Sequence, residues 1–186
     1  MEKPTYFYHA TSPDNERLIK ESDRLKPQKH QHSKWKCLVK NCPEYASVPD
    51  GVWLSATLEH GALPFFSPYG ARRVKIPIKS VIQQLGGKVK LYEGVTVRSN
   101  RDETYVRLML VREDATFEVL QHMKELDVAD NPCLKLTGEY RVARPPTLID
   151  VYVPYPIDIS NWDNVNTWPD SGTRENNRLE RISDTV

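Results

Sequence analysis

The chain is organised around one stretch near its start, Tyr6-Phe7-Tyr8-His9-Ala10-Thr11-Ser12-Pro13. Its three leading aromatic residues predict a short strand, and His9 follows where that strand ends and a polar side chain can face a cleft. Ser12 and Pro13 predict a helix start, because a serine oxygen accepts a bond from a first-turn N–H and proline at N1 needs no donor. A histidine beside a helix N-terminus favours an anion or nucleotide site. The simpler alternative is that His9 bonds a backbone carbonyl.

Composition indicates one ordinary globular domain. Hydrophobic residues make up 39% of the 186 residues and charged residues 27%, which is enough to build a sizeable core. The net charge of +1 argues against broad electrostatic binding of nucleic acid. Apolar content falls towards the end of the chain, so we expect a single domain over residues 1–169 and a polar, disordered tail over 170–186.

Cysteine usage and hydropathy indicate a cellular location. Cys37, Cys42 and Cys133 are an odd number and make no disulfide framework, which favours a reducing compartment. No apolar run approaches the roughly 20 residues of a membrane span, and the first residues show no signal-peptide core. We therefore expect a cytosolic or nuclear protein without a membrane partner.

The remaining periodicity predicts an α+β fold. A mostly antiparallel sheet, whole or split, and about three helices are expected, because strands and helices do not alternate as in a parallel βαβ fold. Apolar spacing of three at Phe117, Leu120 and Met123 favours a helix over 114–126. The polar, proline-containing residues 26–50 predict a long loop, with a short strand at 36–39. The other predicted helices are 13–22 and 79–85, and the other strands are 52–55, 72–78, 88–97, 104–111, 133–142 and 148–153.

One cluster has the residue types of a metal site. His30, His32, Cys37 and Cys42 offer four zinc ligands within thirteen residues, and such a site would favour a zinc-dependent nucleic-acid factor. The alternative is a solvated polar loop, because the C-x4-C spacing is loose. Neither a phosphate-binding glycine loop nor a GxSxG motif is present, which disfavours dehydrogenases, kinases and hydrolases.

A second set of residues is spread along the chain but chemically coherent. His9, Tyr69 and Glu139 each lie near the edge of a predicted strand. Cleavage of a nicotinamide–ribose bond builds an oxocarbenium-like centre, which a carboxylate stabilises while holding a ribose hydroxyl. A tyrosine ring stacks on nicotinamide, and a histidine bonds the other ribose hydroxyl. The set is therefore suited to NAD as a substrate.

These residues occur in motifs that resemble a known family. Residues 8–12, Tyr-His-Ala-Thr-Ser, resemble the strand–His–Gly–Thr–Ser–helix opening of ADP-ribosyltransferase folds, and residues 51–55, Gly-Val-Trp-Leu-Ser, are similar to their second motif strand. Ser67-Pro68-Tyr69 resembles the following Ser-x-x-Tyr, one residue shorter. Residues 138–142, Gly-Glu-Tyr-Arg-Val, resemble the strand that bears the glutamate of the poly(ADP-ribose) polymerases. The motifs stand in family order and cover roughly residues 6–143.

The resemblance implies a fold, a substrate and a set of site residues. It implies an ADP-ribosyltransferase-like domain that transfers ADP-ribose from NAD to a protein or nucleic-acid acceptor, with Glu139 as the catalytic residue. The NAD-binding residues that it implies are His9, Ala10, Thr11, Trp53, Ser55, Ser67 and Tyr69. Ala10 replaces the family's glycine, whose backbone meets the nicotinamide amide. This departure favours the alternative of an inactive domain that serves as a protein-interaction or nucleotide-binding module.

A second resemblance is narrower. Residues 9–13, 51–58 and 67–77 look like the C-terminal domain of the phytanoyl-CoA-hydroxylase-interacting-protein family. This resemblance covers much of residues 5–80 and implies a protein partner without a settled chemistry. The two resemblances are compatible, because such a domain could be a divergent transferase fold, active or inactive.

Overall fold

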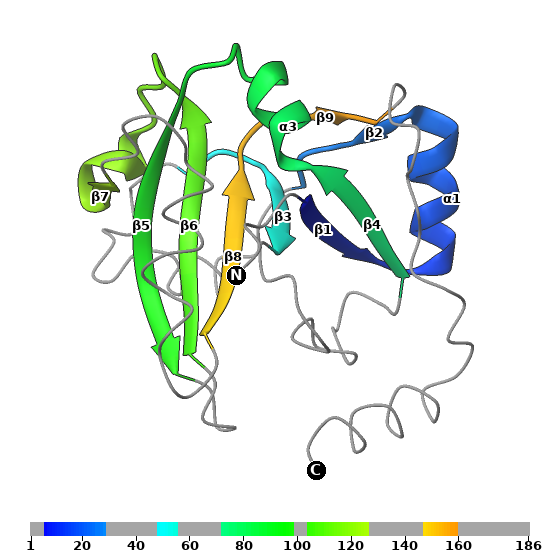
Figure 1. Cartoon of the computed structure of the whole chain (residues 1–186), viewed down its shortest axis with the longest axis horizontal. Coiled ribbons are helices and arrows are strands. Elements are labelled where there is room, and N and C mark those ends of the chain that lie inside the picture. The colour runs from blue at the N-terminus through cyan, green and yellow to red at the C-terminus, as the bar shows by residue number, and fades with distance from the viewer. Residues whose placement is uncertain (1–5, 29–47, 56–71, 99–103, 127–146, 160–186) are drawn as a thin grey trace.

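A computed structural model describes residues 6–28, 48–55, 72–98, 104–126 and 147–159, and the main feature of this part is a seven-stranded sheet. The strands lie in the order β4-β1-β3-β8-β6-β5-β7 (Figure 1). Every described neighbouring pair is antiparallel except β6 and β8, which are parallel. The strands are β1 (Tyr6–Thr11), β3 (Val52–Ser55), β4 (Arg72–Pro77), β5 (Val89–Arg98), β6 (Thr104–Arg112), β7 (Lys124–Leu126) and β8 (Thr147–Val153). The predicted α+β class with a mostly antiparallel sheet is confirmed.

A second, two-stranded sheet completes one rim of the molecule. It consists of β2 (Arg24–Leu25) and β9 (Ile157–Asp158), which pair antiparallel beside helix α3 (Figure 1). The amide of Gln84 joins α3 to β9 twice, donating to the Asp158 carbonyl and accepting from the Asp158 N–H, both at 2.8 Å. Both bonds link residues far apart in sequence, so they hold the end of α3 against the end of the described chain.

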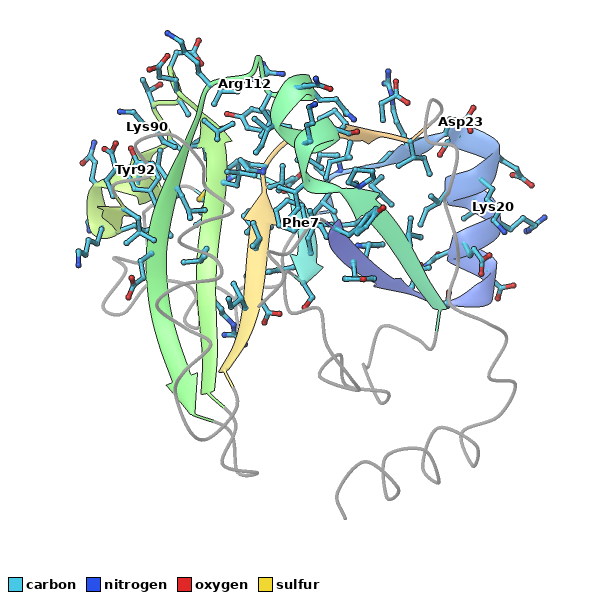
Figure 2. The ribbon with its side chains drawn as sticks, in the orientation of Figure 1. Phe7, Lys20, Asp23, Lys90, Tyr92 and Arg112 are labelled. Atoms are coloured by element: carbon cyan, nitrogen blue, oxygen red, sulfur yellow. The ribbon has the colours of Figure 1, made fainter. Side chains whose placement is uncertain are left out.

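Helix α1 (Pro13–Ser22) has the predicted limits. The Ser12 hydroxyl accepts a bond from the Asn15 N–H at 3.2 Å, which satisfies one free donor of the first turn. The helix ends at Asp23, whose φ of 51° is left-handed. Figure 2 shows Lys20 on the outer side of α1 and Asp23 at the end of the helix, and Ile19 packs against the core. The opening stretch therefore forms the strand, cap and helix that its residues predict.

Helix α3 (Ile78–Gln84) also matches its prediction closely. Gly86 and Gly87 follow it with φ values of 94° and 80°, which side chains rarely adopt, and the Gly87 N–H donates to the Ile82 carbonyl at 2.9 Å. This pair of glycines ends the helix and turns the chain into β5. The strand predicted for 72–78 ends one residue early because Ile78 begins α3.

The helix predicted over 114–126 is wrong. Only Glu118–His122 (η1) is helical there, and it is a 3-10 helix, in which residues three apart stack on one side. Lys124–Leu126 instead forms β7, which pairs with β5. The apolar spacing of three therefore marked a 3-10 turn, and the backbone beyond it pairs with a sheet edge. The described residues consequently hold two α-helices, where about three were expected.

The two faces of the main sheet carry separate apolar clusters, because alternate side chains of a strand point to opposite faces. One face, here called the α3 face, packs against the helices α1 and α3. The other, here called the η1 face, is covered by Val119 and Leu120 of η1. The α3 face includes Phe7, Leu54, Val74, Leu108 and Val151; the η1 face includes Trp53, Tyr92, Met109, Val111 and Tyr152.

Several expectations fall on residues outside the described ranges. These are most of the loop over 26–50 with its short strand, the strand over 133–142, and the tail over 170–186. In the part of the chain that is described, no helix has the length and apolar character needed to cross a membrane.

Candidate functional site

His9 lies inside a strand and not at its end. β1 continues to Thr11, and each of its residues pairs with β4, His9 with Val74 and Thr11 with Arg72. The expectation that the strand ends before His9 is therefore wrong. The reason is that β4 offers a full-length antiparallel partner, which residues 6–13 alone could not reveal.

The ring of His9 connects the strands that carry the first two motifs. Its Nδ1 lies 2.9 Å from the Trp53 carbonyl oxygen of β3. Since a carbonyl only accepts, Nδ1 must donate, and in the neutral ring Nε2 is then an acceptor. The simpler alternative, a bond to a backbone carbonyl, is thus the contact observed. It fixes both the tautomer and the orientation of the ring.

The described part of the β1–β3 junction, where this bond lies, is short. Among the described residues, the register pair that joins the two strands is Tyr8 with Ser55. From His9 to Thr11, β1 keeps its pairing with β4, but no further pair with the described part of β3 follows. The His9 side chain therefore bonds a β3 carbonyl just beyond the point where the backbone ladder ends.

The residues predicted to contact NAD divide between the two faces of the sheet. His9 pairs with Val74 of the α3 face, and Thr11, two residues on, shares that face and is 3% exposed. Trp53 packs in the cluster of the η1 face, and Ser55 shares its side by alternation. A single ligand on either face would therefore meet only part of the set.

Ala10 occupies the register position opposite Arg73 of β4. Ser67, Tyr69 and Glu139 lie outside the described residues, so their relation to His9 stays a prediction.

Gly51, the glycine of the second motif, is required by packing against Tyr152. The ring of Trp53 lies 4.9 Å from the ring of Tyr152, centroid to centroid, and Tyr152 is fully buried with its hydroxyl donating to the Pro49 carbonyl at 2.6 Å. A Cβ added at Gly51 would lie 2.3 Å from the Tyr152 ring. Gly51 is thus required by the close approach of Tyr152, which sequence reasoning did not identify.

A row of polar residues crosses the η1 face beside these aromatic rings. Tyr8 pairs with Ser55, Ser55 with Asp150 of β8, and Asp150 with Arg107 of β6. Cross-strand partners share a face, so their side chains project to the same side. The side chains of Arg107 and Asp150 remain 22% and 30% exposed, with Nε and Oδ2 3.9 Å apart. Sequence reasoning missed both residues.

Asp150 has an unusual environment for a carboxylate. It lies on β8, the middle strand of the seven, between the buried residues Ile149 and Val151. Burial raises the pKa of Asp150 from 3.8 to about 6, and the Arg107 guanidinium opposes part of this rise. A charged residue within an otherwise apolar stretch, 148–153, was the available sequence signal for this position.

The predicted zinc ligands cannot be placed in the same way. His30, His32, Cys37 and Cys42 lie outside the described ranges. Within those ranges, no group of three histidine, cysteine, aspartate or glutamate side chains is arranged to hold a metal ion.

Comparison with known proteins finds no similarity. No family model matches the chain, and no match to it was found among curated proteins or solved structures.

Proposed function

We propose that the protein is an NAD-dependent mono-ADP-ribosyltransferase-like enzyme, acting on a protein or nucleic-acid acceptor. The observation that supports this most directly is the 2.9 Å bond from His9 to the Trp53 carbonyl. It joins the strands of the first two motifs and fixes the ring of the first motif's histidine. Glu139 is the proposed catalytic residue, and Tyr69 the proposed stacking residue, both on the sequence resemblance.

The tautomer of His9 suits the role proposed for it. With Nδ1 donating to the carbonyl, Nε2 of the neutral ring is an acceptor, and a ribose hydroxyl is a donor that matches it. The nicotinamide–ribose bond would break as positive charge builds on the ribose, and the Glu139 carboxylate would stabilise that charge. His9 therefore orients the sugar, and Glu139 acts at the reacting carbon.

A second candidate is a non-catalytic module on the same scaffold, which binds a nucleotide or a protein partner. It is favoured by the division of the predicted residues, since His9 belongs to the α3 face while Trp53 and Ser55 belong to the η1 face. Ala10, which stands in place of the family's glycine, also favours the non-catalytic module.

Ligand-induced stabilisation and turnover distinguish these candidates. NAD or ADP-ribose at a hundredfold excess over Kd should stabilise the folded chain by about 2.7 kcal/mol, measured by thermal unfolding. His9→Gln keeps a donor for the Trp53 carbonyl but removes the ring acceptor, so we expect it to weaken NAD binding. His122→Gln, at an exposed histidine of η1, is the matched control and should bind as wild type does.

Turnover is followed by mass spectrometry of ADP-ribose adducts. Adduct formation that Glu139→Ala abolishes would support the enzyme, and binding of NAD without turnover would support the module. If NAD and ADP-ribose neither stabilise the protein nor are consumed on any protein or nucleic-acid acceptor, the proposed function is wrong.

A further inference from the structure

The last described segment of the chain, residues 157–159, is here called the strap, and it lies between β2 and α3 (Figure 1). On one side β9 pairs with β2, and the Ile159 N–H donates to the Asp23 carbonyl at 2.9 Å. On the other side the Gln84 carboxamide bonds both backbone groups of Asp158 at 2.8 Å. The Gln84 side chain thus takes the place that a third strand would take, and the strap is held through its backbone on both edges.

The side chains of the strap add a second kind of contact. Ile157 and Ile159 are 1% and 4% exposed, and they lie two residues apart, so both project to the same side of the strap. Backbone bonds combined with buried positions for alternate side chains are how proteins take up an added extended segment. The surface between β2 and α3, here called the strap site, therefore has the properties of a site that binds an extended Ile-x-Ile segment.

The strap binds elements that are far from it in sequence. It follows β8 through a connection of three residues, Pro154, Tyr155 and Pro156. Proline fixes its own φ and restricts the residue before it to extended conformations, so this connection is stiff. The contacts of the strap do not depend on which copy of the chain supplies it. A stiff connection favours carrying the strap outwards once the connection has straightened.

Tyr155 holds this connection in its bent form. The chain bends at Tyr155, whose hydroxyl accepts a bond from the Arg112 N–H at 3.3 Å. The Arg112 guanidinium lies 4.5 Å from the centre of the Tyr155 ring, and the ring of Phe117 lies 6.0 Å from it, centroid to centroid. The residues that keep the connection bent are therefore separate from the residues that bind the strap.

We infer that the strap site also binds the strap of a second copy of this chain, so that two copies exchange residues 157–159 and form a symmetric dimer. A second copy is the occupant that fits, because its strap has the same isoleucines and backbone groups that the site already binds. Exchange of an identical element fills both sites of a twofold dimer. The surface goes beyond the proposed function, because it uses none of the residues proposed to act on NAD.

Nuclear magnetic resonance on mixed chains tests the exchange directly. Full-length chains labelled with 15N and chains labelled with 13C are incubated together at high concentration, in urea just below the unfolding midpoint. The dimer is then isolated by size-exclusion chromatography. Nuclear Overhauser cross-peaks should join the Gln84 carboxamide of one chain to Asp158 of the other, because these groups are bonded at 2.8 Å in the strap site.

The rate at which the dimer returns to monomer on dilution gives a second measurement. Monomer and dimer contain the same strap contacts, so Gln84→Ala should leave the dimer fraction at equilibrium unchanged. It should speed dissociation by about fivefold or more, because two hydrogen bonds no longer oppose release of the strap. Gln83→Ala, at an exposed position of the same helix, is the matched control and should dissociate as wild type does.

The connection should control the dimer fraction instead. Arg112→Gln removes the cation above the Tyr155 ring, so it should raise the dimerisation constant by about twofold to fivefold for each connection. Lys88→Gln, which removes an exposed cation 4.0 Å from Glu113, is the control and should leave that constant unchanged. Equal constants for the two variants would refute the role of Tyr155 in holding the bend.

Three results would overturn the exchange itself. The first is a chain that stays monomeric after the incubation. The second is a dimer without cross-peaks between differently labelled chains, which would indicate contact through another surface. The third is a dimer of Gln84→Ala that dissociates as slowly as that of wild type. Cross-peaks between chains together with faster dissociation of Gln84→Ala would support the inference.

Discussion

Replacement of Asp150 by asparagine should stabilise the protein at neutral pH. The folded chain raises the pKa of this carboxyl from 3.8 to about 6, chiefly by desolvation. Its ionised form is thus disfavoured in the folded state relative to the unfolded state. Asparagine has nearly the same shape and carries no charge, so the substitution removes the cost of holding a carboxylate in the middle of the sheet.

The magnitude follows from linkage between protonation and folding. One pH unit of difference between the folded and unfolded pKa values corresponds to about 1.36 kcal/mol, so a change from 3.8 to about 6 corresponds to about 3 kcal/mol. Solvent reaches the 30% exposed side chain and reduces this value, so we expect a gain of about 1–3 kcal/mol at pH 7.5. Because the folded state binds the proton of Asp150 more tightly than the unfolded state, the stabilisation that this group gives to wild type is fully present below pH 3.8. That stabilisation is lost as pH rises through about 6.

Urea denaturation of wild type and Asp150→Asn, each between pH 4 and pH 8, measures this effect. The difference in unfolding free energy should be small at pH 4 and grow with pH, levelling off above about pH 7. Asp114→Asn, at an exposed turn position, is the matched control for the loss of one carboxylate. If Asp150→Asn is less stable than wild type at pH 7.5, the attraction of Arg107 outweighs desolvation, and the reasoning from burial is refuted.

Three further substitutions test the packing around the second motif and the first helix. Gly51→Ala should cost about 1–3 kcal/mol in urea denaturation, because the added Cβ would lie 2.3 Å from the Tyr152 ring; a stability equal to that of wild type would contradict this contact. Tyr152→Phe should cost about 1 kcal/mol of unfolding free energy through loss of the 2.6 Å bond to the Pro49 carbonyl. Gly51→Ala should still destabilise the protein when it is added to Tyr152→Phe, because the phenylalanine ring remains in the way of the new Cβ. Ser12→Ala should cost about 1 kcal/mol by removing the cap on the Asn15 N–H, whereas Ser80→Ala within α3 should cost less; equal losses would argue against the cap.

Local patterns in the sequence predicted most of the described elements. The Ser12 cap, the stop at Gly86 and Gly87, and the alternation of residues 72–77 each depend on neighbours in the chain. The helix prediction for 114–126 was wrong because apolar spacing of three is shared by an α-helix and a 3-10 turn. The chain beyond the turn becomes a strand because it pairs with β5, which is distant in the sequence.

The candidate sites were less predictable, for a related reason. His9 and Trp53 were expected to face one ligand, but the face of a side chain depends on the strand register, which local patterns do not contain. Asp150 likewise gains its significance from Ser55 and Arg107, which lie on two other strands. Sequence reasoning found residues with useful chemistry but could not determine which of them meet.

The junction of β1 with β3 connects the stability of the sheet to the proposed function. β1 shares six register pairs with β4, but its described pairing with β3 is the single pair Tyr8–Ser55. The His9–Trp53 bond therefore adds to the pairing of β1 with the described part of β3, and any ligand that engages the other nitrogen of His9 acts on the same ring. Since a bound ligand stabilises the state it binds, NAD should strengthen this junction, and slower amide exchange at Trp53 and Leu54 would report it. If His9→Gln lowers stability without affecting NAD binding, the ring serves the junction alone, and the histidine of the first motif is structural.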